Sequence, residues 1–371
     1  MKQLMSIFLC MVMLLSSIVA FADAGDESDN DLGDTKLYKA VVETVTQAAI
    51  EPDGFIEKLL LVESRIKSGD KKGELIHLEV YITSTEAYPM NLKTGDRIIV
   101  GFTTYNDGYE DVFLGDYQRD YAVIWLVLAF VAVILWVGRW QGVKTVATLA
   151  ITLGTIWFVH IPLLLRGVSP IMTTIVIAMI VTTLTIGIVS GWTKKSLAAI
   201  VGTTAGVVIS GVIAYSFSKG IHLTGFSNEE AVMLKFIPQG DIFKATELLL
   251  SGILLGALGA VMDVAMSIAS AIEELNAVSP TMHWRKLYSS GMNIGRDVMG
   301  TMTNTLILAY VGSSLPMILL FVANEMPMMR VMNLDVIATE FVRSLAGSIG
   351  IVMSIPITAL LAVALLKGKM K

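Results

Sequence analysis

The stretch that decides the fold is residues 248–272, LLLSGILLGALGAVMDVAMSIASAI, in which Asp263 is the only charged side chain. A membrane-spanning helix needs about 20 predominantly apolar residues, so this stretch is long enough to cross a bilayer. An aspartate at the centre of such a helix costs roughly 3 kcal/mol, and each surrounding Leu, Ile or Val returns about 0.3–0.6 kcal/mol. The sequence therefore predicts a transmembrane helix that carries a carboxylate at membrane depth.

The chain as a whole is also rich in apolar residues and poor in charged ones. Hydrophobic residues make up 54% of it and charged residues only 16%, with a mean hydropathy of +0.69. A soluble domain typically has about 25% charged residues, so the composition indicates a polytopic membrane protein in a lipid bilayer. Seven charge-free intervals predict about seven transmembrane helices within residues 121–371, namely 121–138, 145–165, 167–193, 196–218, 248–272, 298–324 and 344–366.

The first 22 residues, MKQLMSIFLCMVMLLSSIVAFA, have the pattern of a secretory signal peptide, and an uncleaved signal anchor is the alternative. The single cysteine of the chain, Cys10, lies inside this segment. We therefore expect neither a disulfide nor thiol chemistry in the mature protein.

Residues 25–120 have a different composition. They hold 20 of the 32 acidic residues and 10 of the 27 basic ones, and apolar and polar residues alternate along residues 36–105. Residues 75–82 and 97–102 are predicted strands, and residues 93–96 form a turn before the second of them. We expect a small β-barrel or sandwich outside the cytoplasm, with either a structural or assembly role or a ligand-binding role.

The distribution of Lys and Arg predicts the orientation of the helices. Ten of these residues fall in segments that a cleaved signal peptide would leave inside, and five fall in outside loops beyond residue 121. This bias places the β-domain outside and the C-terminus in the cytoplasm. Because topology explains these basic residues, they do not indicate a nucleic-acid partner.

Small and polar residues recur on one helical face in the last three predicted spans. In the fifth span they include Gly252, Gly256, Gly259, Asp263 and Ser267, and in the sixth they include Asp297, Gly300, Thr301 and Asn304. Small residues let helices approach closely, so we expect these two faces to meet around a polar inner cavity. Asp263, Asn304, Asp297, Thr301 and Ser267 form the predicted substrate- or ion-binding site.

Two other interpretations of Asp263 stay open. It can lock helices together through hydrogen bonds alone, or it can reach the interface if the helix is misplaced. In the seventh span, Glu340 and Arg343 have the i, i+3 spacing of a structural ion pair. His160, before Pro162, is expected at the membrane interface.

Enzyme motifs are missing from the sequence: it has no HExxH, no serine-nucleophile GxSG and no GxGD motif. The four histidines are scattered across different segments without metal-ligand spacing. We therefore expect neither an enzyme nor a metal site nor a cofactor.

Three segments of the C-terminal half carry a resemblance: GILLGALGAVMDVAMSIASAIEEL (252–275), SGMNIGRDVMGTMTNTLILAYVGSSLP (290–316) and LAGSIGIVMSIPITALLA (345–362). They resemble the YibE/F family of bacterial multipass membrane proteins. The resemblance implies a protein of the bacterial cytoplasmic membrane, and a transport role has been supposed for the family.

The sequence thus predicts an α-helical polytopic membrane protein with a small N-terminal extracytoplasmic β-domain. The expected function is transport of a small solute or ion through the polar site of the last three helices. The alternative is a non-transporting accessory or signalling protein whose β-domain binds an envelope partner. The substrate and the oligomeric state are left open.

Overall fold

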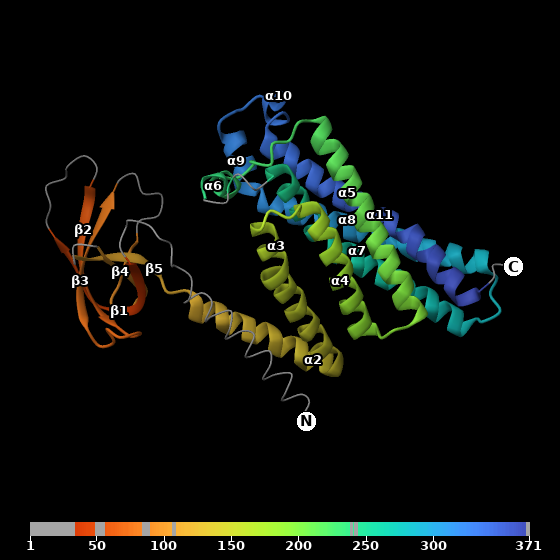
Figure 1. Ribbon diagram of the computed structural model, residues 1–371, viewed down its shortest axis with the longest axis horizontal. Helices are drawn as coiled ribbons and strands as arrows, with labels where there is room; N and C mark the ends of the chain where they lie inside the picture. Colours follow the sequence, from red (N-terminus) through yellow and green to blue (C-terminus); the bar gives the residue numbers. More distant parts are fainter. Residues whose placement is uncertain are drawn as a thin grey trace. The chain divides into compact units, whose positions relative to one another are not determined.

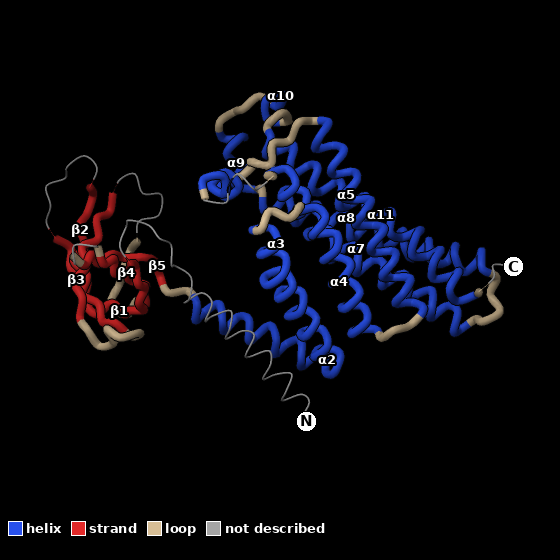
Figure 2. The backbone as a smooth tube through the Cα atoms, in the orientation of Figure 1, coloured by secondary structure: helices blue, strands red, loops and turns tan. Residues whose placement is uncertain are grey.

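The computed structural model describes residues 34–48, 56–83, 90–105, 109–237, 240 and 244–368. The predicted signal peptide, residues 1–22, lies outside these ranges. The described residues fall into two compact units, one up to Val133 and one from Ile134 onward. All strands belong to the first unit, and the second is helical (Figures 1 and 2).

The first unit contains a five-stranded antiparallel sheet in the order β3-β2-β1-β4-β5. Its strands are β1 (Asp34–Ala48), β2 (Ile56–Ile66), β3 (Leu75–Thr83), β4 (Arg97–Thr104) and β5 (Glu110–Tyr117). The two predicted strands are confirmed as β3 and β4. The edge strands β3 and β5 also contact each other, so the described sheet is rolled into an open barrel.

Alternation along the strands decides which side of the sheet is the core, because successive side chains point to opposite faces. Val42, Val62, Ile66, Ile98 and Val100 are at most 1% exposed and lie at every second position of their strands. The predicted turn before β4 is closed by the Asp96 carboxylate, which accepts a hydrogen bond from the Lys93 amide at 2.7 Å.

A break divides the first long helical run of the chain. Helix α2 (Asp120–Thr155) continues through the π-helix η1 (Ile156–His160) into α3 (Ile161–Leu165), but Arg139 has φ 47° and ψ −124°. A Cβ on Gly142 would collide with the Ile134 carbonyl oxygen, so the chain folds back tightly at this break. The break lies between the first and second predicted spans.

The helical unit is built around α7 (Ala245–Val278). This helix contacts α4 (Pro170–Ser190), α5 (Lys194–Gly220), α8 (Trp284–Ser313) and α11 (Asp335–Lys367). The remaining short helices are α6 (Glu229–Met233), η2 (Leu234–Phe236), α9 (Leu315–Ala323) and α10 (Met328–Val331). Positions 253, 254, 261, 268 and 272 of α7 are completely buried among these neighbours.

The described residues include five helices that are long and apolar enough to cross a membrane. A sixth is added if α8 and α9, which meet at a bend of 58°, are counted as one span. The predicted number of seven is reached only when the run from Asp120 to Leu165 is divided at Arg139. The chain is therefore a mostly helical protein whose apolar helices suit a membrane, and the number of crossings stays a prediction.

The backbones of helices α5 and α11 approach each other closely. A Cβ on Gly206 would lie 2.8 Å from the Gly350 carbonyl oxygen, and a Cβ on Gly350 would lie 2.8 Å from that of Gly206. Small residues on both helices permit this approach, as expected for helices packed in a membrane. The small-residue face predicted for the seventh span is therefore a packing surface: Gly350 lies against α5, and Gly347 lies against Leu306 of α8 and Ala257 of α7.

Candidate functional site

Helix α7 has two contrasting faces. The face with Leu254, Val261 and Ile268 is fully buried, whereas Asp263 and Ser267 lie on an exposed face of the helix. In lipid, helices associate through van der Waals packing, and the aliphatic face of α7 is the one that packs among its four neighbouring helices. Asp263 therefore points out of the bundle at the middle of a membrane-length helix.

Helix α8 also turns its polar face away from the bundle. Gly291 packs against Ile272 of α7, and Gly295 packs against Ile355 of α11. At about 100° per residue, Asp297 lies roughly 200° around the helix from Gly295. Asp297, Thr301 and Asn304 are accordingly exposed, and near them Arg296 donates a hydrogen bond to the side chain of Asn293 at 2.9 Å.

The structure does not bring the predicted site residues of the two helices together. Within the described chain, no hydrogen bond or ion pair joins Asp263 or Ser267 to Asp297, Thr301 or Asn304. The glycines of the two faces do not meet each other: a Cβ on Gly252, Gly259 or Gly300 would meet no atom within 4 Å, whereas one on Gly256 would lie 2.6 Å from the Tyr310 hydroxyl of α8. A pattern of small residues shows where two helices can approach closely, but α7 packs in the bundle mainly through its aliphatic face. Whether these polar residues bind a solute stays a prediction.

The predicted ion pair of the seventh span is present. The Arg343 guanidinium donates to the Glu340 carboxylate at 2.7 Å, and the two side chains are 29% and 20% exposed. The guanidinium also lies over the Tyr310 ring, 5.8 Å from its centroid. A cavity of about 110 Å³ beside the pair is lined by Tyr310, Val311, Ser314, Ile318, Ile337, Glu340, Phe341 and Ser344.

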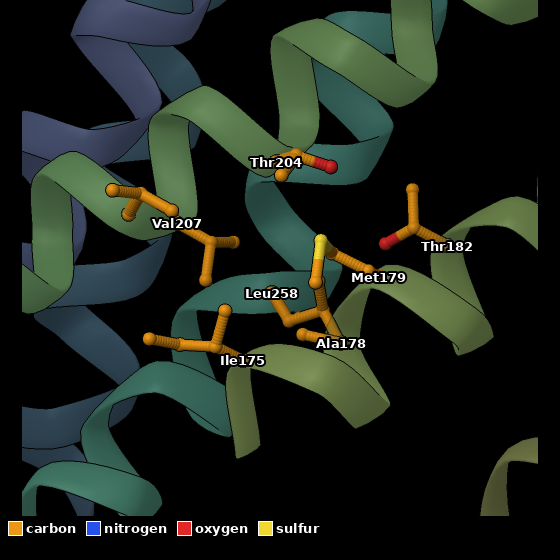
Figure 3. A pocket seen from close by; sticks show the side chains of 8 residues that line it. Ile175, Ala178, Met179, Thr182, Thr204, Val207 and Leu258 are labelled. Carbon is orange, nitrogen blue, oxygen red and sulfur yellow. The ribbon is translucent and has the colours of Figure 1, made fainter. Parts of the chain in front are cut away.

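A second and much smaller cavity lies between α4, α5 and α7 (Figure 3). Its volume is about 10 Å³, close to the minimum for one water molecule. Thr182 and Thr204 contribute the hydroxyl groups of its lining, and the Thr182 hydroxyl is buried without a hydrogen-bond partner. This cavity suits a single water and is too small for a solute.

His160, expected at the membrane interface, is buried among three helical segments. The residue is only 3% exposed and ends the π-helix η1, with its Nε2 atom 3.2 Å from the Ser251 hydroxyl of α7. The Thr174 hydroxyl of α4 lies 2.6 Å from that of Ser251. Sequence reasoning placed His160 by its distance from the end of its span. Its partners are 14 and 91 residues away, so only the packing reveals the group.

Among the described residues, no three His, Cys, Asp or Glu side chains are grouped so as to hold a metal ion. The candidate site residues described above lie on α7, α8 and α11 and in the cluster around His160. A comparison with protein families covers all of these segments: residues 126–368 match the family model described as YibE/F-like protein. The chain belongs to the YibE/F-like family.

No curated protein and no solved structure shows significant similarity to the chain. The match to the YibE/F-like family begins inside α2 and runs to the end of α11, so it contains every candidate site residue. The five strands of the β-domain lie outside it. Family membership therefore agrees with a membrane-embedded helical unit and leaves the activity open.

Proposed function

We propose that this YibE/F-like protein is a non-enzymatic membrane protein that moves a small solute or ion along the polar faces of α7 and α8. The observation that carries the proposal is the position of Asp263. It lies at the middle of a helix whose most apolar 18-residue window has a mean hydropathy of 2.1, and it points away from the bundle. A carboxylate at membrane depth is costly against acyl chains, so it faces water or another polypeptide.

Helix α8 supports the same interpretation. Asp297 and Asn304 lie on the side of this helix that does not pack on α7 or α11, and α8 continues through a 58° bend into the apolar α9. A helix with one polar side at membrane depth needs a water-filled or protein-covered surface there. The carboxylate and amide oxygens of these two polar faces can contact a migrating cation or a polar solute.

We further propose that the protein resides in the bacterial cytoplasmic membrane, with the β-domain outside and the C-terminus in the cytoplasm. The excess of Lys and Arg in the proposed inside segments supports this orientation.

The transport proposal is tested by comparing metabolite and metal profiles of a deletion strain that expresses either the wild type or the Asp263→Asn variant. The amide is nearly isosteric and keeps hydrogen-bonding capacity, but it has no charge. We expect the Asn variant to reach normal abundance and yet leave the profile of the deletion strain unrestored. Glu274→Gln is the matched control, because Glu274 is an exposed acid of α7 beyond its apolar part. Full restoration of the metabolite and metal profile by the Asp263→Asn variant would contradict the transport proposal.

A specific observation also favours the accessory function as a second candidate. On the outer face of the sheet, the Phe113 ring lies over Gly101, and Leu37 is the cross-strand partner of Gly101 on the other side. Phe113 is 40% exposed and Leu37 63% exposed, so together they form an apolar surface suited to a protein partner. If this function is the main one, Leu37→Asp abolishes complementation while Asp263→Asn has no effect. The transport proposal predicts the opposite pattern.

A further inference from the structure

The buried cluster formed by His160, Ser251 and Thr174 joins three helical segments and has no part in the polar faces described above. The three residues are 3%, 2% and 0% exposed. Thr174 donates to the Pro170 carbonyl oxygen at 2.7 Å, its hydroxyl lies 2.6 Å from that of Ser251, and Ser251 lies 3.2 Å from Nε2 of His160. These contacts form one continuous hydrogen-bonded chain.

The number of hydrogens in this chain decides the state of the imidazole. With the only hydroxyl hydrogen of Thr174 on the Pro170 carbonyl, Ser251 donates in its contact with Thr174. Ser251 then has no hydrogen left for His160, and the Thr174 hydroxyl, 3.4 Å from Nε2, has none either, so this arrangement assigns a ring hydrogen to Nε2. In the neutral ring, Nδ1 is therefore an acceptor, and this atom is buried without a hydrogen-bond partner.

We propose that Nδ1 of His160 is a proton-binding site, and that occupation of this site loosens the junction of η1 and α3 with α4 and α7. Binding adds one proton from water to the Nδ1 lone pair and breaks no covalent bond. The resulting N–H group has no acceptor in the closed junction, and a buried charged donor without a partner is costly. The protonated protein therefore favours an arrangement in which water reaches Nδ1.

The position of the cluster suits this role. His160 ends a π-helical turn, a local irregularity that recurs at functional sites, and α3 ends five residues later at Leu165. Glu247 lies one turn before Ser251 on α7, where it accepts a hydrogen bond from Ser169 at 2.6 Å and pairs with Lys244. Helix α4 carries no charged residue, and Arg166 directly follows α3.

The test uses the full-length protein with ¹⁵N-labelled histidine, purified in detergent, and does not depend on the proposed transport function. His160→Gln assigns the His160 signals by their loss. We expect the Nε2–H tautomer at high pH and protonation of Nδ1, with the protein still folded, as the pH falls. In the double variant Ser251→Ala, Thr174→Val, which removes both hydroxyl oxygens near Nε2, the preference for the Nε2–H tautomer should be lost. An Nδ1–H tautomer in the wild type, or no protonation before unfolding, would overturn the proposal.

Opening of the junction is measured by thiol labelling in a background that carries Cys10→Ser. Thr173→Cys reports from a position that is 7% exposed, and its neighbour Met172→Cys, 65% exposed, corrects for the pH dependence of the thiol reaction. We expect the labelling rate of the Thr173→Cys variant, divided by that of Met172→Cys, to rise as the pH falls. This rise should disappear when His160→Gln is added. A ratio that is constant with pH, or that still rises without His160, contradicts the coupling.

Discussion

At the scale of single residues, the acidic side chains of this protein lie in three kinds of surroundings. Asp70, in the β-domain, accepts a hydrogen bond from the Tyr38 hydroxyl at 2.7 Å. Glu340 is paired with Arg343 one turn away, whereas Asp263 has no ion-pair or hydrogen-bond partner among the described residues. The carboxylates of Asp70 and Glu340 are stabilised by their partners. The carboxylate of Asp263 needs solvent or a ligand, so the proposed function rests on this residue.

The partner of Asp70 makes the stability of the β-domain depend on pH. The hydrogen bond from Tyr38 lowers the pKa of Asp70 below its ordinary value of 3.8. A carboxyl whose pKa is lowered by folding stabilises the fold above its ordinary pKa, and this contribution is lost as the pH falls through the folded value. We expect Tyr38→Phe to lower the melting temperature at pH 7, with a difference from wild type that shrinks below pH 3.8.

The melting temperatures of the full-length variants check this prediction at both pH values. Tyr105→Phe is the control, because Tyr105 is an exposed tyrosine of the same domain and no bond between its hydroxyl and a carboxylate is found in the described chain. A Tyr38→Phe deficit that is equally large in acid would contradict the prediction, because it would show that the effect does not come from the ionised Asp70 carboxylate.

Local spacing explains which residue-level features could be predicted. Glu340 and Arg343 are three residues apart on one helix, so their pairing follows from helical geometry alone. The cluster of His160 depends on a residue 91 positions away, and no local pattern brings the two together. Asp263 was recognised as unusual from its apolar context, but the direction in which it points depends on four neighbouring helices.

At the scale of secondary-structure elements, small residues have two different roles in this protein. On α5 and α11 they let two backbones touch, whereas on α7 the positions of Gly252 and Gly259 are open and only Gly256 lies against α8, at the Tyr310 hydroxyl. The sequence shows the same kind of stripe in both places. The stripes differ in what they contact, and that depends on how the neighbouring helices pack.

Alanine substitutions separate these two roles. A Cβ on Gly206 would lie 2.7 Å from Val261 and 2.8 Å from the Gly350 carbonyl, so Gly206→Ala overpacks the interface. We expect a loss of about 1–3 kcal/mol of stability, measured as a lower melting temperature in detergent. Gly252→Ala, at an open position of α7, should leave stability unchanged or raise it slightly through better helix propensity. Equal melting temperatures for the two variants would contradict the close contact.

At the scale of the whole molecule, two features of the fold were predictable for different reasons. Alternation of apolar and polar residues located β3 and β4, because one side of the sheet is a core. Runs without charge located the long helices, because a membrane core excludes charge. The division at Arg139 and the bend between α8 and α9 set the number of crossings, and both are local backbone geometries that hydropathy does not encode.

Thiol labelling in intact cells tests the orientation. Lys194→Cys and Asn228→Cys place reporters at exposed positions, one at the first residue of α5 and one after its end, in a chain whose Cys10 is replaced by serine. We expect a membrane-impermeant reagent to label the Asn228→Cys variant and not the Lys194→Cys variant. Both should react after the cells are permeabilised. Labelling of position 194 alone in intact cells would reverse the proposed topology and place the β-domain in the cytoplasm.

The glycine contact between α5 and α11 has a consequence for biosynthesis. Helix α5 begins at Lys194 and α11 ends at Lys367, so the ribosome makes the first surface long before its partner. At about 5–20 residues per second, the delay is on the order of 10 s. During that time the glycine face of α5 has no α11 to pack against. A chain that stops before Asp335 never gains this partner helix, so Gly206 stays without its contact to the Gly350 backbone.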